Sequence, residues 1–102
     1  MPEELNEEGL EKAIGSGEAW VIDFWADWCG PCKKMAPHFE EASEELDVNF
    51  GKVDMDKHQQ LGGKMGVRAL PTVLIFEDGE EIARKSGFMD KDKLKNWINS
   101  EA

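Results

Sequence analysis

The chain has 102 residues, of which 40% are hydrophobic, and this length and composition predict a single domain over residues 1–102. Its 22 acidic and 12 basic side chains give a formal net charge of −10, which argues against nucleic acid as a partner, because phosphate binding needs clustered Lys and Arg. No apolar run approaches the roughly 20 residues that cross a bilayer, and the acidic N-terminus lacks the basic and apolar regions of a signal peptide. We therefore expect no membrane association and a cytoplasmic location.

Helices and strands are expected to alternate in the first half of the chain. Asn6 can cap a first helix that runs to about Ile14. The apolar run W-V-I-D-F-W at 20–25 is typical of a strand buried on both faces. Apolar residues then recur at helical spacing over 32–46, where Pro37 is expected to kink the helix.

The second half is expected to add a β-hairpin and two further helices. Gly62-Gly63 weakens the first of these helices, and Asp78-Gly79 is typical of a type I′ hairpin turn. The expected elements are a strand at 48–54, a weak helix at 57–65, strands at 72–77 and 81–86, and a last helix capped by Asp90. A strand–helix–strand unit followed by an antiparallel hairpin predicts an α/β fold, with one mixed sheet of four strands flanked by four helices.

The two cysteines, Cys29 and Cys32, are spaced C-x-x-C at the junction of a buried strand and a helix. A structural disulfide across so short a loop would stabilise the fold by only about 2 kcal/mol. A zinc site would need two more ligands, and the only histidines, His38 and His58, lie twenty residues apart. Redox chemistry is therefore the favoured interpretation, and we expect no metal.

The N-terminus of a helix lowers the pKa of a thiol, because its free N–H groups and its dipole stabilise a thiolate. Pro31 suits the first helical turn, and Gly30 lets a substrate backbone approach. We expect Cys29, at the exposed tip, to be the nucleophile. Cys32, one turn into the helix, is expected to be shielded and to react second.

Asp23 lies within the run W-V-I-D-F-W, where both faces of the strand are expected to be dry. Burying an unpaired carboxylate is costly, so this group should either face a cation or take up a proton.

The string D-F-W-A-D-W-C-G-P-C-K at 23–33 closely resembles the thioredoxin family, and the resemblance covers about residues 10–100. Further matching features are Pro37, V-R-A-L-P-T at 67–72, Asp78-Gly79, Gly87, Leu94 and Trp97-Ile98. Members of the family usually begin with a β-strand. Residues 1–5 are too short and acidic for a convincing one, so we expect four strands, with that at 48–54 at an edge of the sheet.

The resemblance implies an enzyme that reduces protein disulfides by dithiol–disulfide exchange, with a redox-active disulfide Cys29–Cys32 and no bound cofactor. Cys29 would be the nucleophile and Cys32 the resolving cysteine. Asp23 would accept and donate the proton of Cys32, with Lys52 as its partner; a purely structural Asp23–Lys52 ion pair is the alternative. Pro71 would be a cis-proline beside the cysteines.

The resemblance also implies partners and a docking surface. A thioredoxin reductase would supply electrons, disulfide-containing client proteins would receive them, and we expect the protein to act as a monomer. The implied docking and active-site residues are Trp28, Gly30, Pro31, Ala69, Leu70, Pro71, Gly87 and Phe88.

Three other functions remain open at this point. The protein could be a reductant dedicated to one client, a non-catalytic docking module, or a glutaredoxin-like enzyme. The cysteine pair with Asp23 argues against the docking module, and the W-C-G-P context argues against a glutaredoxin.

Overall fold

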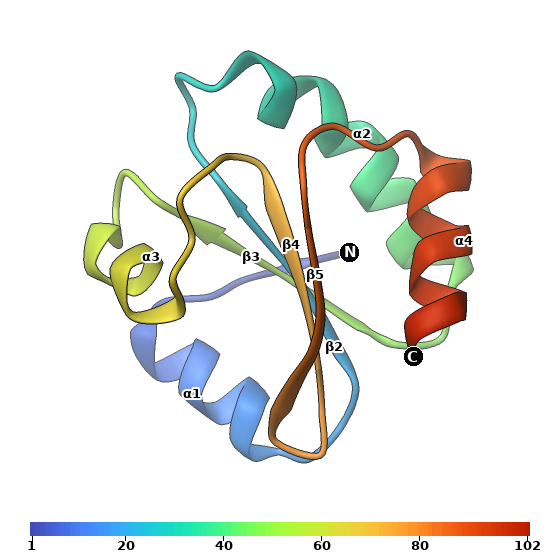
Figure 1. The fold of residues 1–102 in the computed structure, drawn as a ribbon, viewed down its shortest axis with the longest axis horizontal. Helices are drawn as coiled ribbons and strands as arrows, with labels where there is room; N and C mark the ends of the chain where they lie inside the picture. The colour runs from blue at the N-terminus through green and yellow to red at the C-terminus, as the bar shows by residue number, and fades with distance from the viewer.

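Five strands and four helices make up the computed structural model, which describes all of residues 1–102 (Figure 1). In chain order they are β1 (Glu3–Glu4), α1 (Glu7–Gly15), β2 (Trp20–Trp25), α2 (Gly30–Glu45), β3 (Asn49–Asp54), α3 (Gln59–Met65), β4 (Thr72–Glu77), β5 (Glu80–Ser86) and α4 (Lys91–Glu101). β2 and β4 have the bounds expected from the sequence. None of the helices has the length and hydrophobicity needed to cross a bilayer.

The strands form one mixed sheet in the order β1-β3-β2-β4-β5. β2 and β3, which precede and follow α2, are parallel, whereas β4 is antiparallel to both β2 and β5. Helices α2 and α4 cover one face of the sheet, and α1 and α3 cover the other (Figure 1). The α/β fold with a mixed sheet between helices is therefore confirmed.

The strand count expected from the sequence was one too low, because β1 pairs in parallel with β3. Glu3 lies opposite Gly51, and the N–H of Leu5 donates to the carbonyl of Lys52 at 2.8 Å. A Cβ on Gly51 would lie 2.6 Å from a methyl carbon of Leu5, so the glycine makes room for the buried leucine. The pairing uses backbone groups and one apolar anchor, which is why the acidic segment 1–5 gave no strand signal. β3 is consequently an interior strand rather than an edge strand.

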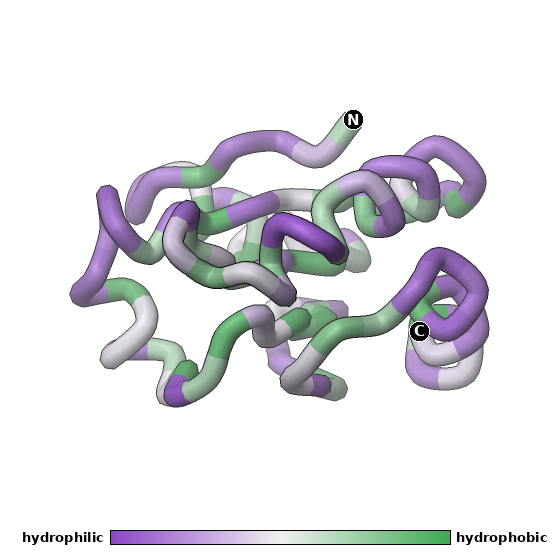
Figure 2. Tube along the Cα trace, turned by 90° about the horizontal axis from the view of Figure 1, so that it is seen from above, coloured by the Kyte–Doolittle hydropathy of each residue, from purple (hydrophilic) through white to green (hydrophobic).

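Each face of the sheet has its own hydrophobic core. Side chains alternate along a strand, so β2 sends Val21 into the core under α2 and α4, and sends Ile22 and Phe24 into the core under α1 and α3. Figure 2 shows the matching pattern in α4, beside the C-terminus, where hydrophobic positions recur in a mostly hydrophilic helix. Asp23, two residues after Val21, therefore lies on the face that α2 covers.

Local sequence signals account for several element ends. The side chain of Asn6 accepts a hydrogen bond from the N–H of Gly9, and that of Asp90 accepts one from Lys93, so both predicted caps are confirmed. Asp78 and Gly79 have φ values of 56° and 81°, both positive as a type I′ turn requires. The chain reverses there between β4 and β5.

Candidate active site

Cys29 and Cys32 are joined by a disulfide at the start of α2, with their Cα atoms 5.2 Å apart. Cys29 is the N-cap of α2, so this helix begins two residues earlier than the hydrophobic pattern predicted. The N–H of Cys32 donates to Sγ of Cys29 at 3.2 Å, which places a free helix N–H against the sulfur. Pro31 occupies the first turn, where no N–H partner is lost.

Both cysteines are covered in this oxidised protein. Cys29 is 5% exposed and Cys32 is 2% exposed, so the prediction that Cys29 stands at an exposed tip is wrong here. The reason is that Met55 and Leu70, from two other segments, pack against the small cluster formed by Ala26 and the two cysteines. Cys29 is more exposed than Cys32, as expected, but the difference in exposed fraction is small.

The carboxyl group of Asp23 is buried, with 1% of the residue exposed, and neither of its oxygens has a hydrogen-bond partner. Loss of water around this group raises its pKa from 3.8 to about 7, and the positive charge of Lys52 opposes this rise. The side chain therefore titrates close to neutral pH. A carboxyl group with such a pKa can either accept or donate a proton under ordinary conditions.

Lys52 faces Asp23 in the β2–β3 register, but the two side chains form no direct ion pair. The ammonium nitrogen of Lys52 instead lies 4.8 Å from the centre of the Trp25 ring. The structural ion pair considered as an alternative is therefore absent from the structure. Lys52 influences Asp23 through its charge alone.

Two parts of the docking surface implied by the resemblance, Trp28 and the segment Ala69–Leu70, lie close together beside the disulfide. Trp28, which is 73% exposed, lines a cleft of about 330 Å³ together with Ala69 and Leu70. The Leu70–Pro71 peptide bond is cis, as the resemblance implied, and Pro71 is buried. The full cleft lining is Trp28, Met55, Asp56, Gln59, Val67, Arg68, Ala69 and Leu70.

Gly87 and Phe88 lie next to the cis-proline segment. The N–H of Gly87 donates to the carbonyl of Pro71 at 2.8 Å. Phe88 remains 38% exposed, and its ring meets Lys34 of α2, whose ammonium is 4.8 Å from the ring centre. The ring of His38 also packs on Phe88 in a T-shaped arrangement, with the centroids 5.5 Å apart. The aromatic ring thus has a defined position on the surface.

Asp56 is a site residue that the sequence reasoning missed. Its carboxylate accepts a hydrogen bond from the indole N–H of Trp28 at 3.0 Å and another from the backbone N–H of Asp27 at 3.4 Å. A signal was present, because the carboxyl ends of parallel strands meet at one edge of a sheet. This rule would have placed residues just after β2 beside residues just after β3, but it was not applied to Asp56.

Comparison with known proteins agrees with this geometry. The family model for thioredoxin matches residues 2–100. The chain belongs to the thioredoxin family. It is 42% identical over 96 residues to the thioredoxin of Rhodospirillum rubrum, covering 92% of this chain and 89% of that protein. It is 43% identical over 81 residues to the thioredoxin of Bacillus subtilis strain 168, covering 78% of each.

Solved thioredoxin structures have the same fold. A mutant thioredoxin from Halobacterium salinarum NRC-1 superposes with a TM-score of 0.90 at 36% identity, covering 98% of this chain and 89% of that one. The thioredoxin of Fasciola hepatica gives a TM-score of 0.89 at 38% identity, covering 98% and 99%. Thioredoxin-family membership and the Cys29–Cys32 disulfide make this protein a thiol–disulfide oxidoreductase that reduces protein disulfides.

Proposed function

We propose that the protein is a general reductant of protein disulfides in which Cys29 attacks, Cys32 resolves and Asp23 transfers the proton of Cys32. The observation that carries this assignment is the unpartnered carboxyl group of Asp23, buried on the sheet face that the cysteine-bearing helix covers. A merely structural acid in this position would be expected to have a hydrogen-bond partner or a cation in contact.

The first step uses Cys29. With the pair reduced, the Cys29 thiolate attacks one sulfur of the client disulfide, a mixed disulfide forms, and the other client sulfur leaves as a thiolate that takes up a proton. The placement of Cys29 at the N-cap supports this role, because the helix N-terminus favours negative charge on its sulfur.

The second step uses Cys32 and Asp23. The Cys32 thiol gives its proton to the Asp23 carboxylate, and the resulting thiolate attacks Sγ of Cys29. The Cys29–Cys32 disulfide forms, the second client sulfur leaves as a thiolate, and two electrons have passed from the protein to the client. A pKa of about 7 supports Asp23 as both acceptor and donor near neutral pH.

Clients would dock in an extended conformation over the apolar surface beside the disulfide. The supporting observations are the exposed faces of Trp28 and Phe88 and the cleft that Trp28 shares with Ala69 and Leu70. Gly30 and Pro31 are also exposed at the start of α2 and leave the approach to Cys29 free of large side chains.

The proposal also includes an electron donor and a cellular location. Members of the thioredoxin family are reduced by a thioredoxin reductase and act on disulfide-containing clients, and we assign both kinds of partner to this protein. Such a cycle requires a reducing compartment, and we place the protein in the cytoplasm.

A Cys32→Ser variant tests the assignment of the two cysteines. It should accumulate covalent complexes with client proteins through Cys29, because the resolving thiol is absent. The complexes are captured from a lysate, released by dithiothreitol and identified by mass spectrometry. Many different clients indicate a general reductase, whereas one client indicates a dedicated reductant.

A Cys29→Ser variant is the matched control. It should capture little or nothing, since its remaining thiol is the more covered of the two. Equal capture by both variants would contradict the assignment of Cys29 as nucleophile. No capture by either variant, with no acceleration of insulin reduction by dithiothreitol, would favour the docking module instead.

A further inference from the structure

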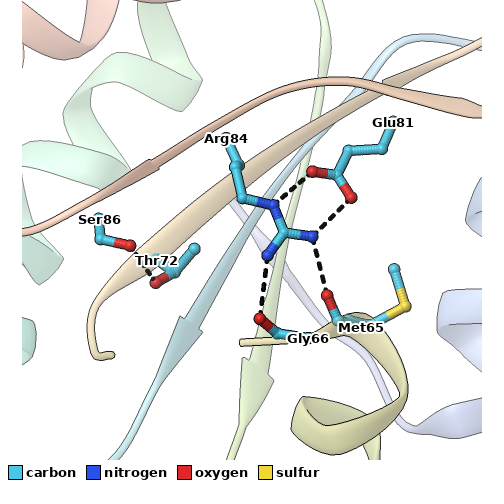
Figure 3. A network of polar contacts seen from close by, with 6 residues as sticks. All are labelled: Met65, Gly66, Thr72, Glu81, Arg84 and Ser86. Atoms are coloured by element: carbon cyan, nitrogen blue, oxygen red, sulfur yellow. Dashed lines mark hydrogen bonds and ion pairs between the residues drawn. The ribbon is translucent and has the colours of Figure 1, made fainter. Parts of the chain in front are cut away.

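Arg84 of β5 connects two segments that are distant in sequence (Figure 3). Its guanidinium donates to the carbonyl of Met65 at 2.8 Å and to the carbonyl of Gly66 at 3.1 Å, both at the end of α3. The same group binds both carboxylate oxygens of Glu81, one of them at 2.7 Å. Such a two-pronged contact fixes the plane of the guanidinium and aims its remaining N–H groups.

A bulge in β5 makes this arrangement possible. Arg84 lies opposite Leu74 and Glu81 lies opposite Phe76, two residues of β4 that pack into the same core. In a regular strand, residues three apart point to opposite faces. The register shift between Ile75 and Phe76 brings Glu81 and Arg84 onto one face, beside α3.

The carbonyls that Arg84 binds lie at the C-terminal end of a short helix. α3 has seven residues and ends at Gly66, whose φ of 68° lies in the left-handed region. The N–H groups of Gly66 and Val67 turn back to the carbonyls of Gly62 and Gly63. The carbonyls of Met65 and Gly66 are left for a partner outside the helix, and a cation there also complements the helix dipole.

The chain after Gly66 is the docking loop, residues 67–71, which contains Ala69, Leu70 and the cis-proline. At its far end, the hydroxyl of Thr72 donates to the carbonyl of Ala69 at 2.6 Å. The same hydroxyl lies 2.8 Å from the hydroxyl of Ser86 (Figure 3). β5 therefore holds the docking loop at both ends, through Ser86 at one and through Arg84 at the other.

We propose that Arg84, oriented by Glu81, is a positioning residue that holds the start of the docking loop and thereby sets the affinity for protein clients. Arg84 touches neither the cysteines nor Asp23, so it acts on the docking step and leaves the exchange chemistry unchanged. This inference rests on the docking surface proposed above. It assigns to the C-terminal hairpin a role in recognition of clients that neither the cysteine motif nor the cis-proline indicates.

An Arg84→Met variant tests the proposal, because it keeps the length of the side chain and removes its donors. We expect the KM for insulin, with dithiothreitol as recycling reductant, to rise about fivefold, because the hydrogen bonds from Arg84 to the carbonyls of Met65 and Gly66 are lost. The kcat, the midpoint potential of the Cys29–Cys32 pair and the rate with bis(2-hydroxyethyl) disulfide, a small neutral substrate, should not change. Amide exchange at Gly66 and Val67 should accelerate.

Lys85→Met is the matched control, since Lys85 is the next residue of β5, carries the same charge and makes none of these contacts. It should leave the KM and the amide exchange unchanged. Glu81→Gln keeps Arg84 but replaces the carboxylate that orients its guanidinium with a neutral amide. It should also raise the KM, by a smaller factor than Arg84→Met. This second variant also serves if Arg84→Met fails to fold.

Three results would overturn the proposal. They are an unchanged KM in both Arg84→Met and Glu81→Gln, an equal loss with insulin and with the small disulfide, and a matching rise in the Lys85→Met control. Failure of the wild-type protein to reduce insulin would instead contradict the proposed function. The amide-exchange measurement on loop anchoring does not depend on that activity.

Discussion

The carboxyl group of Asp23 is buried without a hydrogen-bond partner, so ionising it is unfavourable in the folded protein. Its pKa is about 7 when folded and returns to about 3.8 when the chain unfolds. Between these pH values the folded state holds a proton that the unfolded state has released. The free energy of unfolding therefore falls as the pH rises from about 4 to about 7, and then levels off.

Replacing Asp23 with Asn should remove the fall in the free energy of unfolding between about pH 4 and pH 7. One pKa unit corresponds to about 1.4 kcal/mol, so the variant should gain up to about 4 kcal/mol in the free energy of unfolding at pH 8. At pH 4, where the wild-type side chain is protonated, the two proteins should be equally stable. Urea unfolding at a series of pH values measures the free energy of unfolding of both proteins. Asp47→Asn, at an exposed acid, serves as control: it keeps Asp23, so its free energy of unfolding should follow the pH dependence of the wild-type protein.

An equal gain at pH 4 and pH 8 would contradict ionisation as the cause. In the proposed mechanism, the same desolvation that destabilises the ionised carboxylate would also let Asp23 accept a proton near neutral pH.

At the scale of elements, β1 illustrates how a short segment can complete a sheet. It contributes two residues, a parallel pairing with β3 and the buried side chain of Leu5 over Gly51. Its stability therefore depends on the fit between a leucine and a glycine, and not on the β-propensity of the acidic residues around them.

A double-mutant cycle on Leu5 and Gly51 measures that fit. Leu5→Ala should cost about 2–3 kcal/mol of unfolding free energy, because it leaves space unfilled in a core. Gly51→Ala should also destabilise, since its Cβ would lie 2.6 Å from the leucine. Together the two changes should cost less than their sum by at least about 0.5 kcal/mol. Additive costs in urea unfolding would show that the two residues do not compete for the same space.

At the scale of the whole molecule, the net charge of −10 is distributed unevenly. Residues 1–18 carry six Glu and one Lys, and residues 40–56 carry seven acids and one Lys. The segment 19–39, which contains both cysteines, has two acids and two Lys. An acidic body thus carries a nearly neutral site, and its long-range field should attract positively charged proteins.

The rate of reduction should therefore depend on salt in a way that follows the charge of the client. For a strongly basic disulfide protein, the second-order rate constant should fall about tenfold between about 10 mM and about 300 mM NaCl. It should rise for an acidic client and stay constant for bis(2-hydroxyethyl) disulfide. Glu44→Lys, on the exposed side of α2, should weaken the dependence. Equal salt effects on all three substrates would point to a change in the site itself.

The features that could be predicted from the sequence depend on short stretches of chain. The caps at Asn6 and Asp90, the turn at Asp78-Gly79 and the buried strand at 20–25 each arise from interactions among residues within about four positions. The cysteine pair is also a feature that a short stretch of chain defines. Its chemistry follows from its place between this strand and a helix, which the local pattern already shows.

The features that could not be predicted depend on residues brought together by the sheet. The sequence alone determined an α/β protein of the thioredoxin family, with a C-x-x-C pair between a strand and a helix and an acidic residue inside a buried strand. Only the tertiary structure decided that Leu5 follows a fifth strand and anchors it, that Asp23 and Lys52 make no ion pair, that Asp56 binds Trp28, and that Arg84 binds carbonyls at the end of α3. The reason is that backbone pairing and a bulge set these contacts, and neither leaves a periodic signal in the sequence.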